Sequence, residues 1–434
     1  MTVLKGKRKK GREMKRTLRF ILAAMLTFAL GFALVACNGD NGETTSGDSD
    51  APAGTTTFAI GFGGPLTTGS IDFGQGALRA TELAVAQANE SDRAQDLGIQ
   101  FRIVEGDDES EVQPGLIAAQ NIAAQSDLVG VVGHFNSAVT RPVNDVYNEV
   151  GVVQISYGST NAFLTHDGNP DLPPLADNFF RTCGHDALQG PAGAAAAREL
   201  GFDTVAVITF PDAYGEGLTS EFMPAFEELG GEIVLDDRLV DGQTNFGPEV
   251  TRIRAANPDF IYFGGTFDTA RGAGSLLARQ LVEGGVTAPM MGGDGIQSQG
   301  FIDEAGGEPA EATIATKPGQ DIEDMVGGPA FIADYEAMHD GQAPGGFDAF
   351  AFDAANAIIN AVFDVAEADG VDNVSTPAGR QAVIDRVGAN SFEGVTGNVS
   401  FDERGDRNDA IVTTFLVQDG VWIAHPDVTP YVSR

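Results

Sequence analysis

The chain has 434 residues and a formal net charge of −36, with 26 Lys and Arg residues against 62 Asp and Glu residues. A chain of this length can form two domains of ordinary size, each with its own core. So acidic a surface repels nucleic acid and anionic lipid headgroups, which excludes nucleic acid as a partner. The two cysteines, Cys37 and Cys183, are too few for a disulfide framework.

Residues 1–36 are predicted to be a signal peptide. A basic segment leads into an apolar run, which ends in the small and apolar residues Leu34, Val35 and Ala36 directly before Cys37. These residues resemble the lipobox of bacterial lipoprotein precursors, so Cys37 is expected to carry the lipid. A plain transmembrane helix is the alternative, and its length would be borderline. Met14 is an alternative start, because the shorter signal that follows it is sufficient.

Residues 37–56 are polar and rich in Gly, Ser and Thr, which predicts a flexible tether. Removal of residues 1–36 would leave 17 basic and 61 acidic residues, a net charge of −44, with Lys317 as the single lysine. Such an acidic, lysine-poor composition resembles that of haloadapted proteins. No later stretch is predicted to span a membrane.

From Thr57 onward, short apolar strands alternate with amphipathic helices, as βαβ units require. The first set of predicted strands covers 57–64, 99–108, 128–135 and 151–159, with helices at 73–89 and 115–125. A second set follows residue 184, with strands at 204–210, 231–239, 259–265 and 288–295 and helices at 187–200, 218–230, 247–256 and 271–285. The last segments are a strand at 311–318, helices at 331–339 and 347–368, and strands at 397–402, 410–420 and 421–425. Two sets of parallel units predict an α/β protein with two doubly wound lobes.

Four polar side chains are predicted at strand ends. Ser137 and Thr160 follow two neighbouring strands and lie near helix N-termini, at the sheet edge where open α/β folds bind ligands. Tyr214 follows a strand of the second set, and Asp294 follows another between glycines, where a carboxylate can reach a ligand ammonium. A partly buried loop tyrosine and a solvated turn aspartate are the alternatives for these last two residues.

The glycines after the first strand raise the possibility of a dinucleotide-binding enzyme. They do not form the G-x-G-x-x-G pattern, and Pro65 interrupts them, although Asp107 and Asp108 end the second strand as that fingerprint requires. The sequence also lacks the P-loop, HExxH and G-x-S-x-G motifs. We keep an α/β enzyme as a weak rival without predicting catalytic residues.

The histidines and the second cysteine are interpreted as structural. The five histidines have no metal-ligand spacing, so no metal site is predicted; they are His134, His166, His185, His339 and His425. His134 is expected to make hydrogen bonds near a strand end. Cys183 has no neighbouring base motif and is interpreted as a packed thiol, with a nucleophile as the alternative.

Seven segments, found in one order from Thr57 to Val417, resemble the leucine/isoleucine/valine-binding proteins. They read VVGHFNSAVTRPVNDVY, RTCGHDALQGP, PDAYGEGL, DFIYFGG, MGGDG, ATKP and FDERGD. These proteins are the substrate-binding components of branched-chain amino acid ABC importers and belong to the type I periplasmic binding proteins. The resemblance implies two Rossmann-like lobes joined by a three-segment hinge, with lobe 1 at 57–182 and 318–395 and lobe 2 at 183–317 and 396–434.

The resemblance also assigns ligand-binding residues. It implies that Ser137 and Thr160, with the backbone around Gly158 and Ser159, hold a ligand carboxylate, which agrees with the preference of helix N-termini for anions. Second-lobe residues Tyr214 and Asp294 would contact the ligand ammonium, and Phe73 would line the side-chain pocket.

Three departures from the family pattern stand out. Thr266, followed by Phe267, occupies the place of a usual tyrosine, and Asp294 is shorter than the usual glutamate. A first-lobe disulfide of some members is absent, with Ser110 and Asn136 near the matching places.

The resemblance implies an exported, lipid-anchored, monomeric solute-binding protein without catalytic activity or cofactor. It would capture an amino acid and deliver it to an inner-membrane ABC permease, in the periplasm or at the outer face of the cytoplasmic membrane. An amide, a urea-like compound or an aromatic acid is an alternative ligand on the same scaffold. A sensory ligand-binding module is a further alternative, which would need a transmembrane helix and a signalling domain after Arg434.

Overall fold

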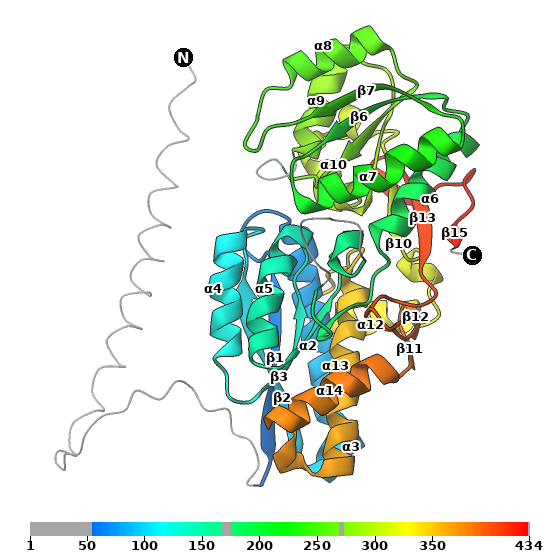
Figure 1. Ribbon diagram of the computed structural model, residues 1–434. Helices are drawn as coiled ribbons and strands as arrows, with labels where there is room; N and C mark the ends of the chain where they lie inside the picture. Colours follow the sequence, from blue (N-terminus) through cyan, green and yellow to red (C-terminus); the bar gives the residue numbers. More distant parts are fainter. Residues whose placement is uncertain (1–53, 167–174, 269–272, 433–434) are drawn as a thin grey trace, which may run out of the picture. The chain divides into compact units, whose positions relative to one another are not determined.

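The computed structural model describes residues 54–166, 175–268 and 273–432 (Figure 1). The predicted signal peptide, Cys37 and most of the predicted tether lie outside the described residues. Residues Pro52–Arg434 form one compact unit by their internal contacts.

The first sheet has five strands, all parallel, in the order β2-β1-β3-β4-β5. The strands are β1 (Thr56–Gly64), β2 (Ile99–Asp107), β3 (Leu128–Gly133), β4 (Val153–Ser156) and β5 (Phe179–Arg181). Every residue of β3 and β4 is buried. Such continuous burial explains why β3 consists of apolar residues and glycine, because helices cover both faces of a parallel sheet.

Helices cover the two faces of this sheet separately. Alternate residues of β1 point to opposite faces: Phe58, Ile60 and Phe62 belong to one core cluster, while Ala59 belongs to another with Val139 of α5. Figure 1 shows α4 and α5 side by side on one face, away from α2 and α13. The helices are α2 (Ile71–Glu90), α3 (Asp92–Leu97), α4 (Val112–Ala123), α5 (Ser137–Glu149), α12 (Gly328–Met338), α13 (Asp348–Asp369) and α14 (Pro377–Ala389).

Helix α13 differs from expectation in one respect. By length and apolar composition it could cross a membrane, although the sequence predicted no such stretch after the tether. Within the fold, 83% of its most apolar window is buried. It packs against α2 and β3, so its apolar character is explained by its position in the core.

The second sheet continues the same pattern and then changes direction. Its order is β14-β13-β10-β9-β8-β6-β7, with β15 paired to β13. Strands β6 to β10 are mutually parallel, whereas β13 is antiparallel to β10, β14 and β15. The strands are β6 (Thr204–Thr209), β7 (Glu232–Arg238), β8 (Phe260–Gly264), β9 (Met290–Gly292), β10 (Ile314–Pro318), β13 (Ile411–Gln418), β14 (Val421–Ala424) and β15 (Tyr431–Val432).

The chain passes between elements of the two sheets three times. It passes from β5 to α6, from β10 to α12, and from a small hairpin of β11 and β12 to β13. The predicted α/β fold with two doubly wound sheets is thus confirmed. The remaining elements are α6 (Asp186–Glu199), α7 (Ala213–Glu228), α8 (Gly247–Ala256), α9 (Gly274–Glu283), α10 (Gln299–Ala305), α11 (Gly307–Ala310), β11 (Phe392–Gly394) and β12 (Gly397–Val399), with 3₁₀ turns η1 (Ala162–Leu164), η2 (Asp294–Ile296), η3 (Ile322–Asp324) and η4 (Val371–Asn373).

A buried polar group fixes the end of β3. The His134 Nδ1 atom lies 2.6 Å from Asp108 Oδ2, and its Nε2 atom lies 3.0 Å from the Tyr147 hydroxyl. The side chains of His134 and Asp108 have no exposed surface. This agrees with a hydrogen-bonding, structural role for His134. Removing one partner would leave the other buried without compensation.

We therefore expect Asp108→Ala to lower the free energy of unfolding by about 3–5 kcal/mol, as for a broken buried pair. Asp127→Ala is the matched control, because its partner Arg102 is 39% exposed in the side chain and the pair lies at the edge of the same sheet. The control should lose about 1 kcal/mol or less. Chemical denaturation of both variants measures this, and equal losses would contradict the structural role.

Candidate functional site

Helix α5 begins directly at the carboxyl end of β3. Asn136 is the residue before the helix, and Ser137 is its first residue, with 2% exposure. The Ser137 Oγ atom accepts a hydrogen bond from Asn161 N at 3.2 Å, which ties the ends of β3 and β4 together. The first N–H groups of a helix have no partner within the helix and favour a negative charge. This point of the fold can therefore receive an anion.

The turn after β4 is held by serine hydroxyls. Ser156 Oγ accepts from the N–H groups of Gly158 and Ser159, at 3.3 and 2.9 Å. The Ser159 hydroxyl lies 2.6 Å from Thr140 Oγ1 and 2.9 Å from the backbone oxygen of Phe135. The side chain of Ser159 is thus used to join two loops of the protein.

Thr160 ends this turn and is fully buried. A three-residue 3₁₀ turn, η1, follows it rather than the α-helix that the sequence suggested. The Thr160 hydroxyl lies beside the carboxylate of Asp186, at the start of α6, and the Asp186 N–H donates to the Thr160 backbone oxygen at 2.7 Å. Asp186 therefore belongs to the surroundings of the site, although the sequence gave no reason to single it out.

Asp294 follows β9 and begins the 3₁₀ turn η2. It is 1% exposed, so it is not a solvated turn residue. The Tyr214 hydroxyl donates to Asp294 Oδ1 at 3.2 Å and accepts from Gly295 N at 3.0 Å. A Cβ atom on Gly293 would lie 2.5 Å from the Tyr214 hydroxyl, and one on Gly295 would lie 2.7 Å from its ring. The two glycines therefore make room for Tyr214, which lies in the first turn of α7.

Burial dominates the electrostatics around Asp294. It raises the pKa of Asp294 to about 6, although hydrogen bonds from Gln189 and Tyr214 and the charge of Lys317 act in the opposite direction. Burial, followed by the charge of Asp294, raises the pKa of Asp186 well above its usual value. Burial also lowers the pKa of Lys317 to about 8. Asp294 is thus a buried carboxylate that gains from a cationic ligand.

These elements line a cavity of about 10 Å³. The lining residues come from the ends of β3, β4, β8 and β9 and from α7; they are Phe135, Asn136, Ser137, Gly158, Tyr214, Thr266, Asp294 and Gly295. Asp294 is the one charged residue among them. In this state the cavity has room for at most about one water molecule, far less than the roughly 300–1,000 Å³ of pockets that hold drug-sized ligands and cofactors.

Five of the predicted residues line this cavity, and three do not. Ser137, Gly158, Tyr214, Thr266 and Asp294 line the cavity, whereas Ser159, Thr160 and Phe73 lie next to its walls. The Phe73 ring stacks on Phe135, with ring centres 4.5 Å apart, and Phe347 contacts both rings edge-on. Phe135, rather than Phe73, is thus the phenylalanine that lines the cavity, and it was assigned no role from the sequence. Its place two residues before Ser137 was the available signal.

Thr266 departs from the family pattern and has an internal partner. Its Oγ1 atom donates to Asp268 Oδ2 at 2.9 Å, and Asp268 also accepts from Ser70 Oγ at 3.2 Å. The Thr266 hydroxyl is therefore held at the wall of the cavity by a group that links β8 to the start of α2.

The glycines and the thiol considered for catalysis have packing roles. A Cβ atom on Gly63 would lie 2.3 Å from the His134 ring, so this glycine makes room for a side chain rather than for a phosphate. Cys183 is fully buried, and burial raises the pKa of its thiol to about 12, which keeps it protonated and unreactive. Among the described residues, one cluster could hold a metal ion, and it lies outside the cavity: His166, His185 and Asp406.

The sequence and the fold both match known proteins. Residues 57–419 match a family model described as periplasmic binding protein. The chain is 30% identical to the Leu/Ile/Val-binding protein homolog 2 of Brucella abortus over 81% of this chain and 89% of that protein. Two crystal structures share the fold. A leucine-binding protein from Thermotoga maritima has a TM-score of 0.74 and 23% identity, over 86% of this chain and 98% of that one. A benzoate complex of an ABC transporter solute-binding protein from R. palustris has a TM-score of 0.73 and 19% identity, over 87% of this chain and 98% of that one.

The raised pKa of Asp294 predicts a pH-dependent stability. The native state holds a proton on Asp294 up to about pH 6, whereas the unfolded chain loses it near the ordinary aspartate pKa of 3.8. The contribution of Asp294 to stability is therefore full below about pH 4 and is lost as the pH rises to about 6. Relative to wild type, Asp294→Asn should gain about 2–3 kcal/mol in free energy of unfolding between pH 4 and pH 7 in ligand-free protein.

Denaturant unfolding at several pH values measures this difference. Asp303→Asn is the matched control, because Asp303 is exposed on the nearby helix α10. The prediction is contradicted if the free energy of unfolding changes with pH in the same way in wild type and in Asp294→Asn, because ionisation of Asp294 would then not destabilise the fold.

Proposed function

The chain belongs to the periplasmic binding protein family, and we propose that it captures a branched-chain amino acid and delivers it to an ABC permease. Members of this family bind solutes outside the cytoplasm and are not enzymes. The proposal concerns the finer points, namely the ligand, the residues that hold it and the permease as recipient. The Leu/Ile/Val-binding relative supports a branched-chain amino acid as ligand.

The arrangement of charge in the cavity carries this proposal. One wall is the N-terminus of α5 with the Ser137 hydroxyl, and another is the buried carboxylate of Asp294. An α-amino acid has a carboxylate and an ammonium on one carbon, so it complements both walls. Among the described residues, the lining contains no Lys, Arg or His, so the helix N-terminus and hydroxyl groups would bind the carboxylate.

Each predicted residue then has a chemical role. Ser137 and Gly158, which line the cavity, would donate to the ligand carboxylate through the hydroxyl and the backbone N–H group, and Ser159 and Thr160 would support them from beside the wall. Asp294, oriented by the Tyr214 hydroxyl, would accept from the ammonium, whose charge would lower the raised pKa of Asp294 and keep it ionised.

The apolar part of the ligand would contact aromatic rings. Phe135 lines the cavity and is supported by Phe73 and Phe347. Burial of a branched aliphatic side chain against these rings contributes about 1.5–3 kcal/mol. This supports a ligand such as leucine over glycine or a purely polar amide.

Closure of two lobes is the proposed mechanism of capture. We assign residues 57–182 and 318–395 to lobe 1 and residues 183–317 and 396–434 to lobe 2. Contacts between them support a closed state: Asp72 Oδ2 accepts from Ser298 Oγ at 2.6 Å and from Gly300 N at 2.9 Å. The affinity is then set by the contacts of the closed state minus the cost of closure.

The location at the membrane is part of the same proposal. Lipidation of Cys37, after removal of residues 1–36, would anchor the protein as a monomer beside the permease, with residues 37–56 as tether. This part rests on the sequence alone.

An aromatic acid is the second candidate ligand, and one observation favours it. Phe135 lines the cavity with Phe73 and Phe347 packed on it, and a protein of the same fold was crystallised with benzoate. Its carboxylate would occupy the same helix N-terminus, and Asp294 would then face the ligand in its protonated form. The two candidates therefore differ in whether Asp294 is needed as an anion.

A ligand screen tests the proposed function. Leucine, isoleucine and valine should raise the melting temperature of the protein, since a ligand at 100 times its dissociation constant stabilises by about 2.7 kcal/mol. Isobutyramide, urea and benzoate should not. Stabilisation by benzoate or an amide, with none by any amino acid, would contradict the assignment.

Two variants should separate the two halves of the site. Asp294→Ala should weaken leucine binding by about 10–100-fold, the value of a charged hydrogen bond, and should weaken 4-methylpentanoate much less. Replacing both Ser137 and Thr160 by Ala should abolish binding of both ligands. Isothermal titration calorimetry measures these losses, with Asp303→Ala as control. Equal losses of the two ligands in Asp294→Ala would contradict the ammonium contact.

A further inference from the structure

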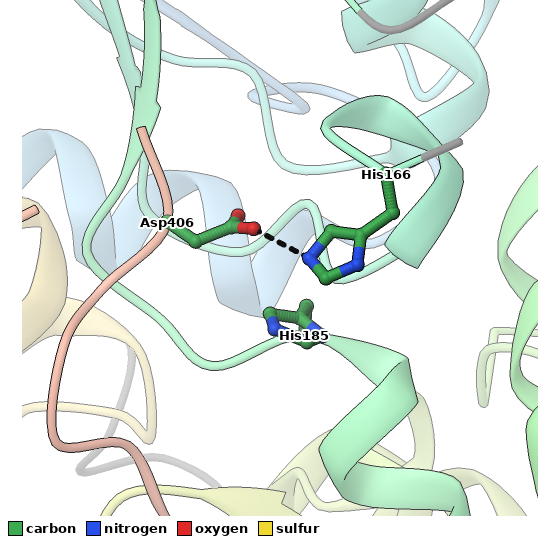
Figure 2. Close-up of side chains that lie close together, drawn as sticks. All are labelled: His166, His185 and Asp406. Atoms are coloured by element: carbon green, nitrogen blue, oxygen red, sulfur yellow. Dashed lines mark hydrogen bonds and ion pairs between the residues drawn. The ribbon is translucent and has the colours of Figure 1, made fainter. Parts of the chain in front are cut away.

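A cluster of metal-ligating side chains lies where the chain passes between the two sheets. His166 follows η1, His185 directly precedes α6, and Asp406 lies between β12 and β13. One ring nitrogen of each histidine and one carboxylate oxygen all lie within 4.8 Å of one another. Figure 2 shows the three side chains converging from three separate segments.

One ring nitrogen of the cluster has no hydrogen-bond partner among the described residues and could bind a metal ion. His166 Nε2 lies 2.8 Å from Asp406 Oδ2, which is the one interaction between the three residues in Figure 2. The His185 Nδ1 atom is buried and has no hydrogen-bond partner among the described residues. An unpaired buried nitrogen is costly, and a metal ion would satisfy it.

The surroundings of Asp406 orient its carboxylate. Arg181 Nε donates to Oδ1 at 2.5 Å, and Thr165 Oγ1 donates to Oδ2 at 2.8 Å. In metal sites, hydrogen-bond partners of this kind hold the side chains that bind the metal in position. The charge of Arg181 acts against a cation, so two imidazoles and the carboxylate must outweigh it. This favours a metal that binds imidazole well over Mg²⁺ or Ca²⁺, which prefer oxygen ligands.

We propose that His166, His185 and Asp406 form a binding site for a divalent transition metal, with Zn²⁺ as the ion that fits best. Zinc binds nitrogen and oxygen at about 2.0–2.2 Å, so tetrahedral ligands lie about 3.3 Å apart. The 2.8 Å pair of His166 and Asp406 would open by about 0.5 Å, and the wider pairs would approach through side-chain rotation. With three protein ligands, a fourth position stays open for water.

The site is open to solvent on one side and joins separate parts of the chain. The His166 side chain is 29% exposed, whereas that of Asp406 is 4% exposed, so an ion can enter beside His166. Bound metal would tie the segment after β4, the start of α6 and the segment before β13 to one another. It would therefore restrain the passages between the sheets.

Zinc titration of chelator-treated protein without amino acid tests the proposal. Isothermal titration calorimetry in 0.15 M salt should show one tight site per chain that excess Mg²⁺ does not compete for. His166→Ala and His185→Ala should each weaken the binding of Zn²⁺ by at least about 100-fold. This exceeds the loss expected for a residue that only hydrogen-bonds to a metal ligand. His425→Ala is the matched control and should bind as wild type does. Asp406 is kept, because its loss would leave Arg181 buried without a counter-ion.

Two further readouts identify the site and its mechanical effect. Co²⁺ should give the visible absorption of a tetrahedral complex in wild type but not in the double histidine variant. Zn²⁺ should slow amide hydrogen exchange in the segments around residues 166, 185 and 406. Wild-type Zn²⁺ affinity in the double variant, or binding that Mg²⁺ displaces equally, would overturn the proposal. Neither outcome depends on which amino acid the cavity binds.

Discussion

The turn that follows β4 depends on one buried guanidinium. Arg181 has no exposed surface, and it donates to the backbone oxygens of Ser159 and Asn161, at 3.0 and 2.8 Å, and to Asp406. Burial would raise the pKa of Asp406, but the charge of Arg181 and the hydrogen bonds from His166 and Arg181 together outweigh it and keep this pKa below its ordinary value. Since a buried unpaired charge costs several kcal/mol, none of these partners can move away alone. The turn after β4 and the segment before β13 are thus coupled through Arg181.

The residues of the cavity come from segments that are distant in sequence, and the parallel sheets bring them together. Its residues follow β3, β4, β8 and β9, whose carboxyl ends lie at the edge where open α/β sheets bind ligands. The helix N-terminus at Ser137 supplies positive potential without a cationic side chain. Among the described lining residues, Asp294 supplies the one negative charge.

The sequence predicted most strands and helices because their period and burial are local properties. Ser137, Tyr214 and Asp294, which were singled out because each follows a strand, all line the cavity. Phe135 and Asp186 were not singled out, and Phe73 lies behind Phe135, because side-chain direction depends on contacts distant in sequence. Strand β5 and helices α3, α10, α11 and α14 were missed as well. The spacing of the histidines hid the pair formed by His166 and His185, whose third partner is Asp406, 240 residues after His166.

The single lysine after residue 36, Lys317, has a practical consequence. Its side chain is 3% exposed, and its ammonium donates to the backbone oxygen of Gly346 at 3.2 Å. Because its pKa is lowered to about 8, the amine is a good nucleophile near neutral pH as soon as a reagent reaches it. An amine-directed label on residues 37–434 therefore has one internal target, and its rate of attachment there reports how often that part of the fold opens.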